Sequence, residues 1–368
     1  MRKVETKKIE FEKVAQSLNE WYTVIKQNNI PKATAMREKI VKALPDMEEN
    51  QNVLLYFNLI DSRFKLMTEN YRESGHLLGK ADYETCTDDM IQYYFYLFNG
   101  LYNFYQKDFI EAINFYKIAE SRLSKVPDEI ERAEFHYQTA IAYYEIRQNF
   151  FSLNHAEKAL ESFRAVDNYI NRVIKCTMLF AMNKVDLQQW EQAISLYKNA
   201  IHIAQKVKDG LSEGLGHFNL GVCYERQERL ELAKESFLRA LDIPEHCDSV
   251  YSIRSMYMLS RVFYKLGSIE SARVWRSKAL AYADKVNEEV YRAKLNLIYF
   301  VYDATDHESF DLNMNVLKGK NLWSDVADLS LNAALYYKKQ ENADLSSKYF
   351  EEACTAKDKI IKFTEALS

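Results

Sequence analysis

A motif that returns every 39 to 41 residues constrains the fold of this 368-residue chain more than any other feature. The motif is a small residue, a large residue four positions later and an alanine seven positions later, as in "AINFYKIA" and "AISLYKNA". The closing alanines of the copies are Ala119, Ala159, Ala200, Ala240, Ala279 and Ala353. The last interval is close to two periods, so we expect a degenerate unit near residues 290 to 325.

A second small residue precedes the first small residue of each copy by twelve positions. These residues are Gly100, Ala140, Ala181, Gly221, Ser260 and Ala334. Short polar turns such as "QKD" and "RQER" lie between the two, so each unit reads as two antiparallel helices that approach closely at small residues. This pattern is typical of tetratricopeptide repeats, although their usual period is about 34 residues. We therefore predict an all-α superhelix of about seven helix pairs over residues 87–368, with a concave groove.

Residues 1–70 do not share the repeat and are predicted to form a three-helix bundle. The first helix is expected over residues 8–28, and Pro31 suits the first turn of the second. The third helix is expected to start at "PDMEENQN", with Asp46 as its N-cap and Glu49 completing a capping box. Such a cap would fix the direction of the side chains in the first turn.

A segment with two glycines, residues 71–86, is predicted to link the bundle to the repeats. Gly75 and Gly79 lie in "YRESGHLLGKAD" and favour a flexible connection. We expect this linker to absorb any motion between the two domains.

Composition and motifs exclude several classes of protein. A formal net charge of -4 gives the whole chain no electrostatic basis for binding nucleic acid. The chain has no apolar run of about 18 residues that could span a membrane, and no signal peptide opens it. Five scattered cysteines without a C-x-x-C pair indicate reduced thiols and a cytoplasmic protein. No P-loop, GxGxxG, GxSxG or HExxH motif is present, so we expect no metal or cofactor of the chain's own.

Two groups of amides remain as candidate functional residues. Gln51 lies in "EENQN" at the start of a helix whose other side is apolar, and it is either solvated surface or a group presented to a partner. Asn183 and Asn219 lie beside the small residues of two repeat helices, and Asp186 shares a face with Asn183. A carboxamide can hold a peptide backbone by two hydrogen bonds. The alternative is that both asparagines are buried structural amides.

The whole arrangement resembles the Rap family of bacterial regulators. The stretches most similar to that family are "MEENQNVLLYFNLIDSRF" in the bundle and "AIAYYEIRQNFFSLNHAEKALE" in the second repeat. Rap proteins bind response regulators and are controlled by short secreted signalling peptides in quorum sensing. The resemblance covers essentially the whole chain, and it implies a bundle that binds a response regulator and a repeat domain that binds a peptide.

The resemblance implies a catalytic role for Gln51. In phosphatase members the matching glutamine enters the phosphorylation pocket of the response regulator and orients a water for attack on the phospho-aspartate. The partner supplies that phospho-aspartate and a bound Mg²⁺. The implied contacts with the response regulator are Glu48, Glu49, Asn50, Asn52 and Leu55.

This sequence departs from the family pattern beside Gln51. Asn50 and Asn52 stand where acidic residues are usual, so two negative charges are missing near the expected contact. Some family members block a DNA-binding response regulator without hydrolysing anything, and this sequestration is the alternative function. A third alternative, a DNA-binding peptide sensor, is disfavoured because Glu48 and Glu49 would repel phosphate.

The resemblance also implies a peptide site. Asn183 and Asn219, with Asp186, are expected to hold a pentapeptide or hexapeptide in the concave groove. Binding there would shift the protein away from its partner-binding arrangement through a difference in affinity between two states.

Overall fold

The structure of the chain, a computed structural model, describes residues 8–27, 29–79 and 88–365. Within these ranges the chain forms helices and their connections, and a single isolated bridge pairs Ile9 with Met47. The chain divides into two compact units, Met1–Glu145 and Ile146–Ser368. None of the described helices is both long and apolar enough to cross a membrane. The all-α prediction is confirmed.

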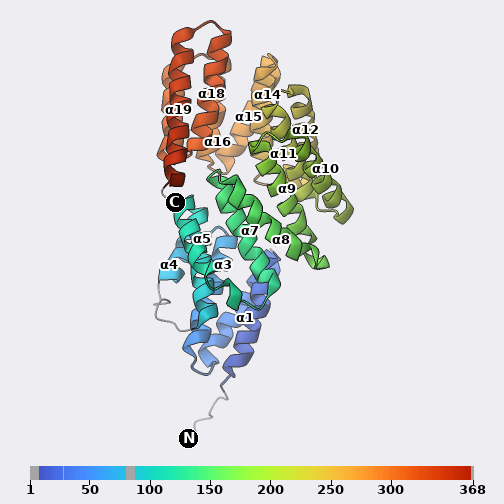
Figure 1. Ribbon diagram of the computed structural model, residues 1–368, viewed down its shortest axis with the longest axis vertical. Helices are drawn as coiled ribbons and strands as arrows, with labels where there is room; N and C mark the ends of the chain where they lie inside the picture. Colours follow the sequence, from blue (N-terminus) through green and yellow to red (C-terminus); the bar gives the residue numbers. More distant parts are fainter. Residues whose placement is uncertain (1–7, 28, 80–87, 366–368) are drawn as a thin grey trace. The chain divides into compact units, whose positions relative to one another are not determined.

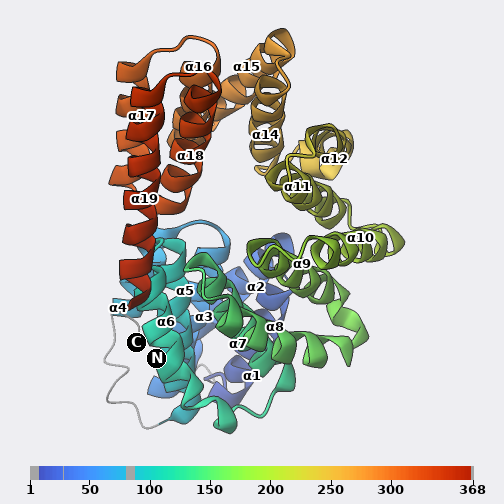
Figure 2. The same ribbon diagram turned by 45° about the horizontal axis from the view of Figure 1, so that its top comes forward.

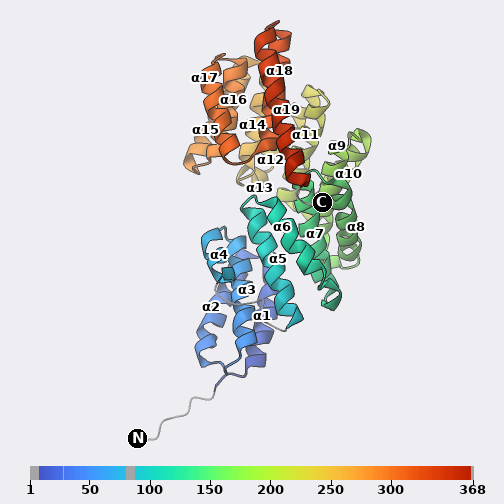
Figure 3. The same cartoon turned by 60° about the vertical axis from the view of Figure 1, so that its left-hand side comes forward.

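The first unit begins with the predicted bundle (Figure 3). Its α-helices are α1 (Phe11–Lys26), α2 (Ile30–Ala43), α3 (Gln51–Met67), α4 (Tyr71–Gly79), α5 (Asp89–Tyr105), α6 (Phe109–Glu120) and α7 (Glu129–Glu145). The bundle core is aromatic, because Trp21 of α1 is fully buried against Phe57 and Phe64 of α3, with ring centroids 6.1 and 5.7 Å away. Arg37 of α2 donates two hydrogen bonds to Asp61 of α3, at 2.6 and 2.8 Å.

The predicted linker is helical in its first half. Helix α4 occupies residues 71–79 and packs against both α3 and α5. Small residues allow this close contact: the Ser62 and Ser74 hydroxyls are 2.8 Å apart, and a Cβ on Gly75 would lie 2.8 Å from the Tyr102 ring. Residues 80–86 of the predicted linker lie outside the described residues. Along the chain, the boundary between the two compact units lies between residues 145 and 146, whereas the predicted boundary between domains lies near residue 86.

The second unit continues the repeats (Figures 1 and 2). Its α-helices are α8 (Asn149–Arg164), α9 (Ile170–Asp186), α10 (Trp190–Val207), α11 (Gly210–Arg226), α12 (Leu230–Asp242), α13 (Pro244–Cys247), α14 (Ser252–Lys265), α15 (Ile269–Lys285), α16 (Glu289–Tyr302), α17 (His307–Gly319), α18 (Trp323–Lys339) and α19 (Ala343–Glu365). Helices α16 and α17 are the degenerate unit expected near residues 290 to 325. The first helices of successive pairs, α9, α11, α14, α16 and α18, contact one another in order and form one layer.

Close helix approach at the small residues is confirmed. A Cβ on Gly100 would lie 2.3 Å from the Tyr116 ring, and one on Gly221 would lie 2.6 Å from the Phe237 ring. The large residue of the motif therefore occupies the space that the glycine leaves open. The turns also repeat, because one residue of each hairpin adopts a left-handed backbone. These residues are Lys107, Arg147, Gln188, Glu228, Gly267, Thr305 and Glu341.

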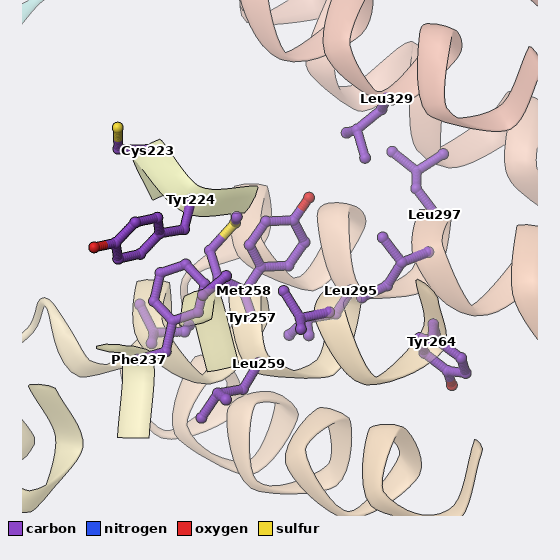
Figure 4. Close-up of a cluster of buried hydrophobic side chains, with 14 of the residues drawn as sticks. Cys223, Tyr224, Phe237, Tyr257, Met258, Leu259, Tyr264, Leu295, Leu297 and Leu329 are labelled. Atoms are coloured by element: carbon purple, nitrogen blue, oxygen red, sulfur yellow. The ribbon is translucent and has the colours of Figure 1, made fainter. Parts of the chain in front are cut away.

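One hydrophobic core of the second unit extends from α9 to α19. Buried side chains from α11, α14, α16 and α18 belong to the cluster shown in Figure 4, which includes Tyr257 and Leu259 of α14 and Leu295 of α16. Each repeat thus buries its apolar face against its neighbours, as expected for a solenoid.

Candidate functional site

Gln51 is the first residue of α3, and its side chain is exposed. The N-cap of α3 is Asn50, whose side-chain oxygen accepts a hydrogen bond from the Val53 backbone N–H at 3.1 Å. The predicted capping box of Asp46 and Glu49 is therefore wrong. Asp46 instead ends a short 3₁₀ turn at residues 44–46, and asparagine caps helices as well as aspartate does. The sequence analysis did not identify Asn50 as the N-cap, although asparagine is a preferred N-cap residue and Asn50 precedes the apolar part of the helix.

The other expected contact residues divide into two groups. Glu48, Glu49 and Asn52 are exposed around Gln51 and are free to meet a partner. Leu55 is only 7 % exposed and belongs to the core of the first unit. The apolar side of α3 therefore faces inward at Leu55, and its contact role stays a prediction.

A cavity of about 460 Å³ opens beside the start of α3, inside the first unit. Asn52, Val53 and Tyr56 of α3 line one wall, while residues of α1 and α5, including Tyr22 and Tyr94, line the others. The cavity thus places three tyrosines, together with polar and charged side chains, next to the exposed tip that carries Gln51.

A buried charge network borders this cavity. Glu131 of α7 is fully buried and accepts hydrogen bonds from Lys26 at 3.1 Å and from the Tyr22 hydroxyl at 3.0 Å. Burial raises the pKa of Glu131, and Lys26 and Tyr22 offset only part of that effect. Burial alone would lower the pKa of Lys26, but Glu131 and Asp128 raise it overall. The network joins α1 to α7 across 105 residues of sequence.

Asn183 is fully buried in the second unit, where the chain itself uses its carboxamide. Its nitrogen donates to the Ser152 hydroxyl and to the Leu179 carbonyl, both at 2.9 Å, and its oxygen accepts from Asn149 at 3.0 Å. The structure therefore gives Asn183 the structural role that was the alternative to peptide binding: it joins α8 to α9.

Asp186 also has partners within the chain. Its carboxylate lies 2.5 Å from Arg147 and 2.7 Å from Arg226, and its side chain is 7 % exposed. The three residues are 39 and 40 positions apart, so they hold nearly the same place in three successive repeats. Asp186 thus links neighbouring repeats.

Asn219 differs from the other two candidates. It is half-buried in the middle of α11, and none of the described residues hydrogen bonds to its carboxamide. Its donor and acceptor remain available, so Asn219 is the amide of this set that can hold a ligand.

A glutamine limits the chemistry that is possible at the tip of α3. A carboxamide has both a donor and an acceptor but no titratable proton. Gln51 can therefore orient a water or a substrate, but it cannot act as a general acid or base. A reaction there requires a second molecule that brings the reactive group.

Comparison with protein-family models identifies both parts of the chain. The model for the N-terminal part of response regulator aspartate phosphatase H matches residues 8–69, and a tetratricopeptide-repeat model matches residues 175–246. The first match includes Gln51 and the whole bundle.

Known relatives match over nearly the full length. Response regulator aspartate phosphatase I of Bacillus subtilis (strain 168) is 32 % identical, over 96 % of this chain and 93 % of the relative. Regulatory protein RapF of the same organism is also 32 % identical, over 92 % of each chain.

Solved structures agree with these relatives. A Rap protein complexed with competence and sporulation factor superposes with a TM-score of 0.88 at 29 % identity, over 96 % of this chain and 99 % of that one. The apo form of RapI gives a TM-score of 0.73 at 30 % identity, over 95 % of this chain and 98 % of that one. With its bundle, its repeats and relatives of this similarity along nearly its full length, this chain belongs to the Rap family.

Proposed function

We propose that this protein is a peptide-regulated phosphatase of a bacterial response regulator and acts in the cytoplasm. It binds the phosphorylated receiver domain through its bundle and hydrolyses the phospho-aspartate. A short signalling peptide bound to the repeats inhibits that activity. The observation that carries the proposal is the exposed Gln51 at the first position of α3, inside a stretch that matches the N-terminal model of a response regulator aspartate phosphatase.

The reaction needs little covalent help from the protein. A water oxygen bonds to phosphorus, the bond between phosphorus and the aspartyl oxygen breaks, and a free carboxylate and inorganic phosphate result. Phosphoryl transfer is catalysed mainly by positioning and electrostatics, and a glutamine that orients water is a known solution. Gln51 would hold that water in line with the leaving oxygen. Mg²⁺ on the partner would supply the charge that stabilises the phosphoryl oxygens.

The catalytic role of Gln51 is tested with a panel of radiolabelled phosphorylated receiver domains. We expect the protein to speed loss of label from at least one of them and Gln51→Ala to abolish that gain, because no other described side chain is expected to place the water. Gln16→Ala, an exposed glutamine on α1, is the matched control and keeps full activity. Rapid loss of label in Gln51→Ala would refute the mechanism.

Sequestration without hydrolysis is the second candidate. Asn50 and Asn52 bring no charge to the contact, and the relatives include both named phosphatases and named regulatory proteins. A tight complex with a receiver domain that keeps its label would favour this candidate over hydrolysis.

Asn219 is the residue through which we test peptide control. Since its carboxamide has no partner among the described residues, Asn219→Ala removes ligand contacts without leaving a neighbour unpaired. We expect the variant to lose peptide inhibition while partner binding stays intact. If Asn219→Ala binds an inhibiting peptide as tightly as the parent protein does, Asn219 is a structural residue and does not bind the peptide.

A further inference from the structure

The backbone just before α3 is held by a residue that precedes α1. The Ile9 N–H donates to the Asp46 carbonyl at 2.8 Å, and the Glu48 N–H donates to the Ile9 carbonyl at 2.9 Å. These bonds flank Met47, which is 6 % exposed and forms the parallel bridge with Ile9. The chain is therefore fixed four residues ahead of Gln51.

A second anchor lies at Asn50. Its extended backbone (φ -148°, ψ 109°) turns the chain into α3, its side chain caps Val53, and its carbonyl accepts from the Leu54 N–H at 3.2 Å. The segment Met47–Asn50 is thus held at both ends, with the exposed Glu48 and Glu49 between the anchors.

Gln51 has no such support from its own side chain. Its carboxamide is exposed, and none of the described residues hydrogen bonds to it. Before a partner arrives, the direction of Gln51 is therefore set by the backbone alone. A misplacement of about 1 Å can reduce a reaction that depends on positioning about a hundredfold.

We propose that Ile9 and Asn50 are positioning residues for Gln51: they clamp the residues before α3, so that its first side chain meets the phosphoryl group in one fixed direction. This inference rests on the proposed function. The clamp is separate from the forces that fold the bundle. Helix α3 is held by Trp21 against Phe57 and Phe64, and by the Arg37–Asp61 pair. Loss of the clamp should thus free the tip without unfolding the helix.

The test compares variants in steady-state hydrolysis of the labelled receiver domain. Ile9→Pro removes the N–H that bonds to Asp46, and Asn50→Ala removes the cap. We expect each to lower kcat about tenfold or more, while KM changes less than about twofold, because positioning acts on the chemical step. Asn50→Asp keeps a capping oxygen and should recover most of the rate that Asn50→Ala loses. Lys8→Pro, which removes none of these bonds, should match the parent.

A second measurement separates this inference from the proposed function. Hydrogen exchange over residues 46–55 should speed up in Ile9→Pro, and the circular dichroism of the helices should stay unchanged. Faster exchange with an unchanged kcat overturns the positioning role. A rise in KM alone also overturns it, because Ile9 and Asn50 would then contribute to binding of the receiver domain and not to the chemical step. If Gln51→Ala hydrolyses as fast as the parent, the proposed function fails instead, and this inference fails with it.

Discussion

His246 is fully buried in the short helix α13, and its environment disfavours a charge. Its Nε2 lies 2.9 Å from the Ser255 hydroxyl, and its Cβ lies so close to Gly214 of α11 that no side chain fits there. Burial, with a smaller effect of Arg254, lowers the pKa of His246 from 6.5 to about 4. Protonation therefore favours the unfolded chain.

This burial predicts a loss of stability in acid. Because the folded pKa of His246 is depressed, its contribution is complete above pH 6.5 and is lost as the pH falls toward 4. The full loss is at most about 3 kcal/mol per histidine. His155, whose pKa burial also lowers to about 4, contributes in the same direction. Burial lowers the pKa of His217 too. We expect His246→Gln to reduce the decrease in the free energy of urea unfolding over this range by up to about 3 kcal/mol. The exposed His202→Gln is the control, and a variant with the parent's pH profile would contradict the prediction.

Single residues also mark where sequence reasoning about the site succeeds and fails. The exposure of Gln51 follows from an amphipathic helix with a polar first turn, and the sequence predicts it. The sequence offers both Asp46 and Asn50 as the cap, because both residue types serve. The hydrogen bond between Ile9 and the Asp46 carbonyl comes from a part of the chain far from α3 in sequence. Nor does it distinguish Asn183 from Asn219. Both are amides beside small residues, but only Asn183 meets Ser152 and Asn149.

At the level of helices and turns, most of the second unit could be predicted, because each pair repeats the same local chemistry. Small residues at fixed spacing specify close antiparallel helices, and a left-handed residue closes each hairpin. Helix α4 was not predictable in this way. Its glycines suggest a break, and its packing against α3 at Ser62 and against α5 at Tyr102 does not follow from the local sequence.

The hairpin turns give a prediction at this scale. Gly267 has φ +74°, and a Cβ there would meet nothing within 4 Å. Gly267→Ala should thus lower the free energy of unfolding by about 1 kcal/mol through backbone strain alone. Gly319 has equally open surroundings at the end of α17 but no positive φ, so Gly319→Ala should leave stability unchanged or raise it by up to about 1 kcal/mol. Urea unfolding of the two variants measures the difference, and an equal effect of both would contradict the turn argument.

At the scale of the whole molecule, ion pairs between residues far apart in the sequence connect helices that the local repeat pattern specifies only one pair at a time. In the second unit, Arg147, Asp186 and Arg226 link three repeats. In the first unit, Lys26 and Glu131 join the bundle to the first repeats. Neither set follows from helix periodicity, since a lysine or glutamate on a helix is by default solvated. The interior placement of Glu131 depends on how α1 and α7 meet.

That placement makes Lys26 important for the stability of the first unit. Removing one partner of a buried ion pair leaves an uncompensated charge, so we expect Lys26→Met to cost about 3 kcal/mol or more near neutral pH. Adding Glu131→Gln removes that charge while keeping an acceptor for the Tyr22 hydroxyl, and most of the loss should be recovered. Lys65→Met is the matched control, since its partner Glu73 is largely exposed and the expected cost is below about 1 kcal/mol.

The pH dependence of Lys26→Met provides a separate test of the buried charge. Burial already raises the pKa of Glu131, and loss of the lysine raises it further. A carboxyl with a raised folded pKa contributes stability that is complete below its unfolded pKa and is lost as the pH rises through the folded value. The deficit of Lys26→Met in urea unfolding should therefore shrink from about pH 8 to about pH 5, as Glu131 takes up a proton. A deficit that stays constant with pH, or a double variant no more stable than Lys26→Met, would show that lost packing of the lysine and not the stranded carboxylate is responsible.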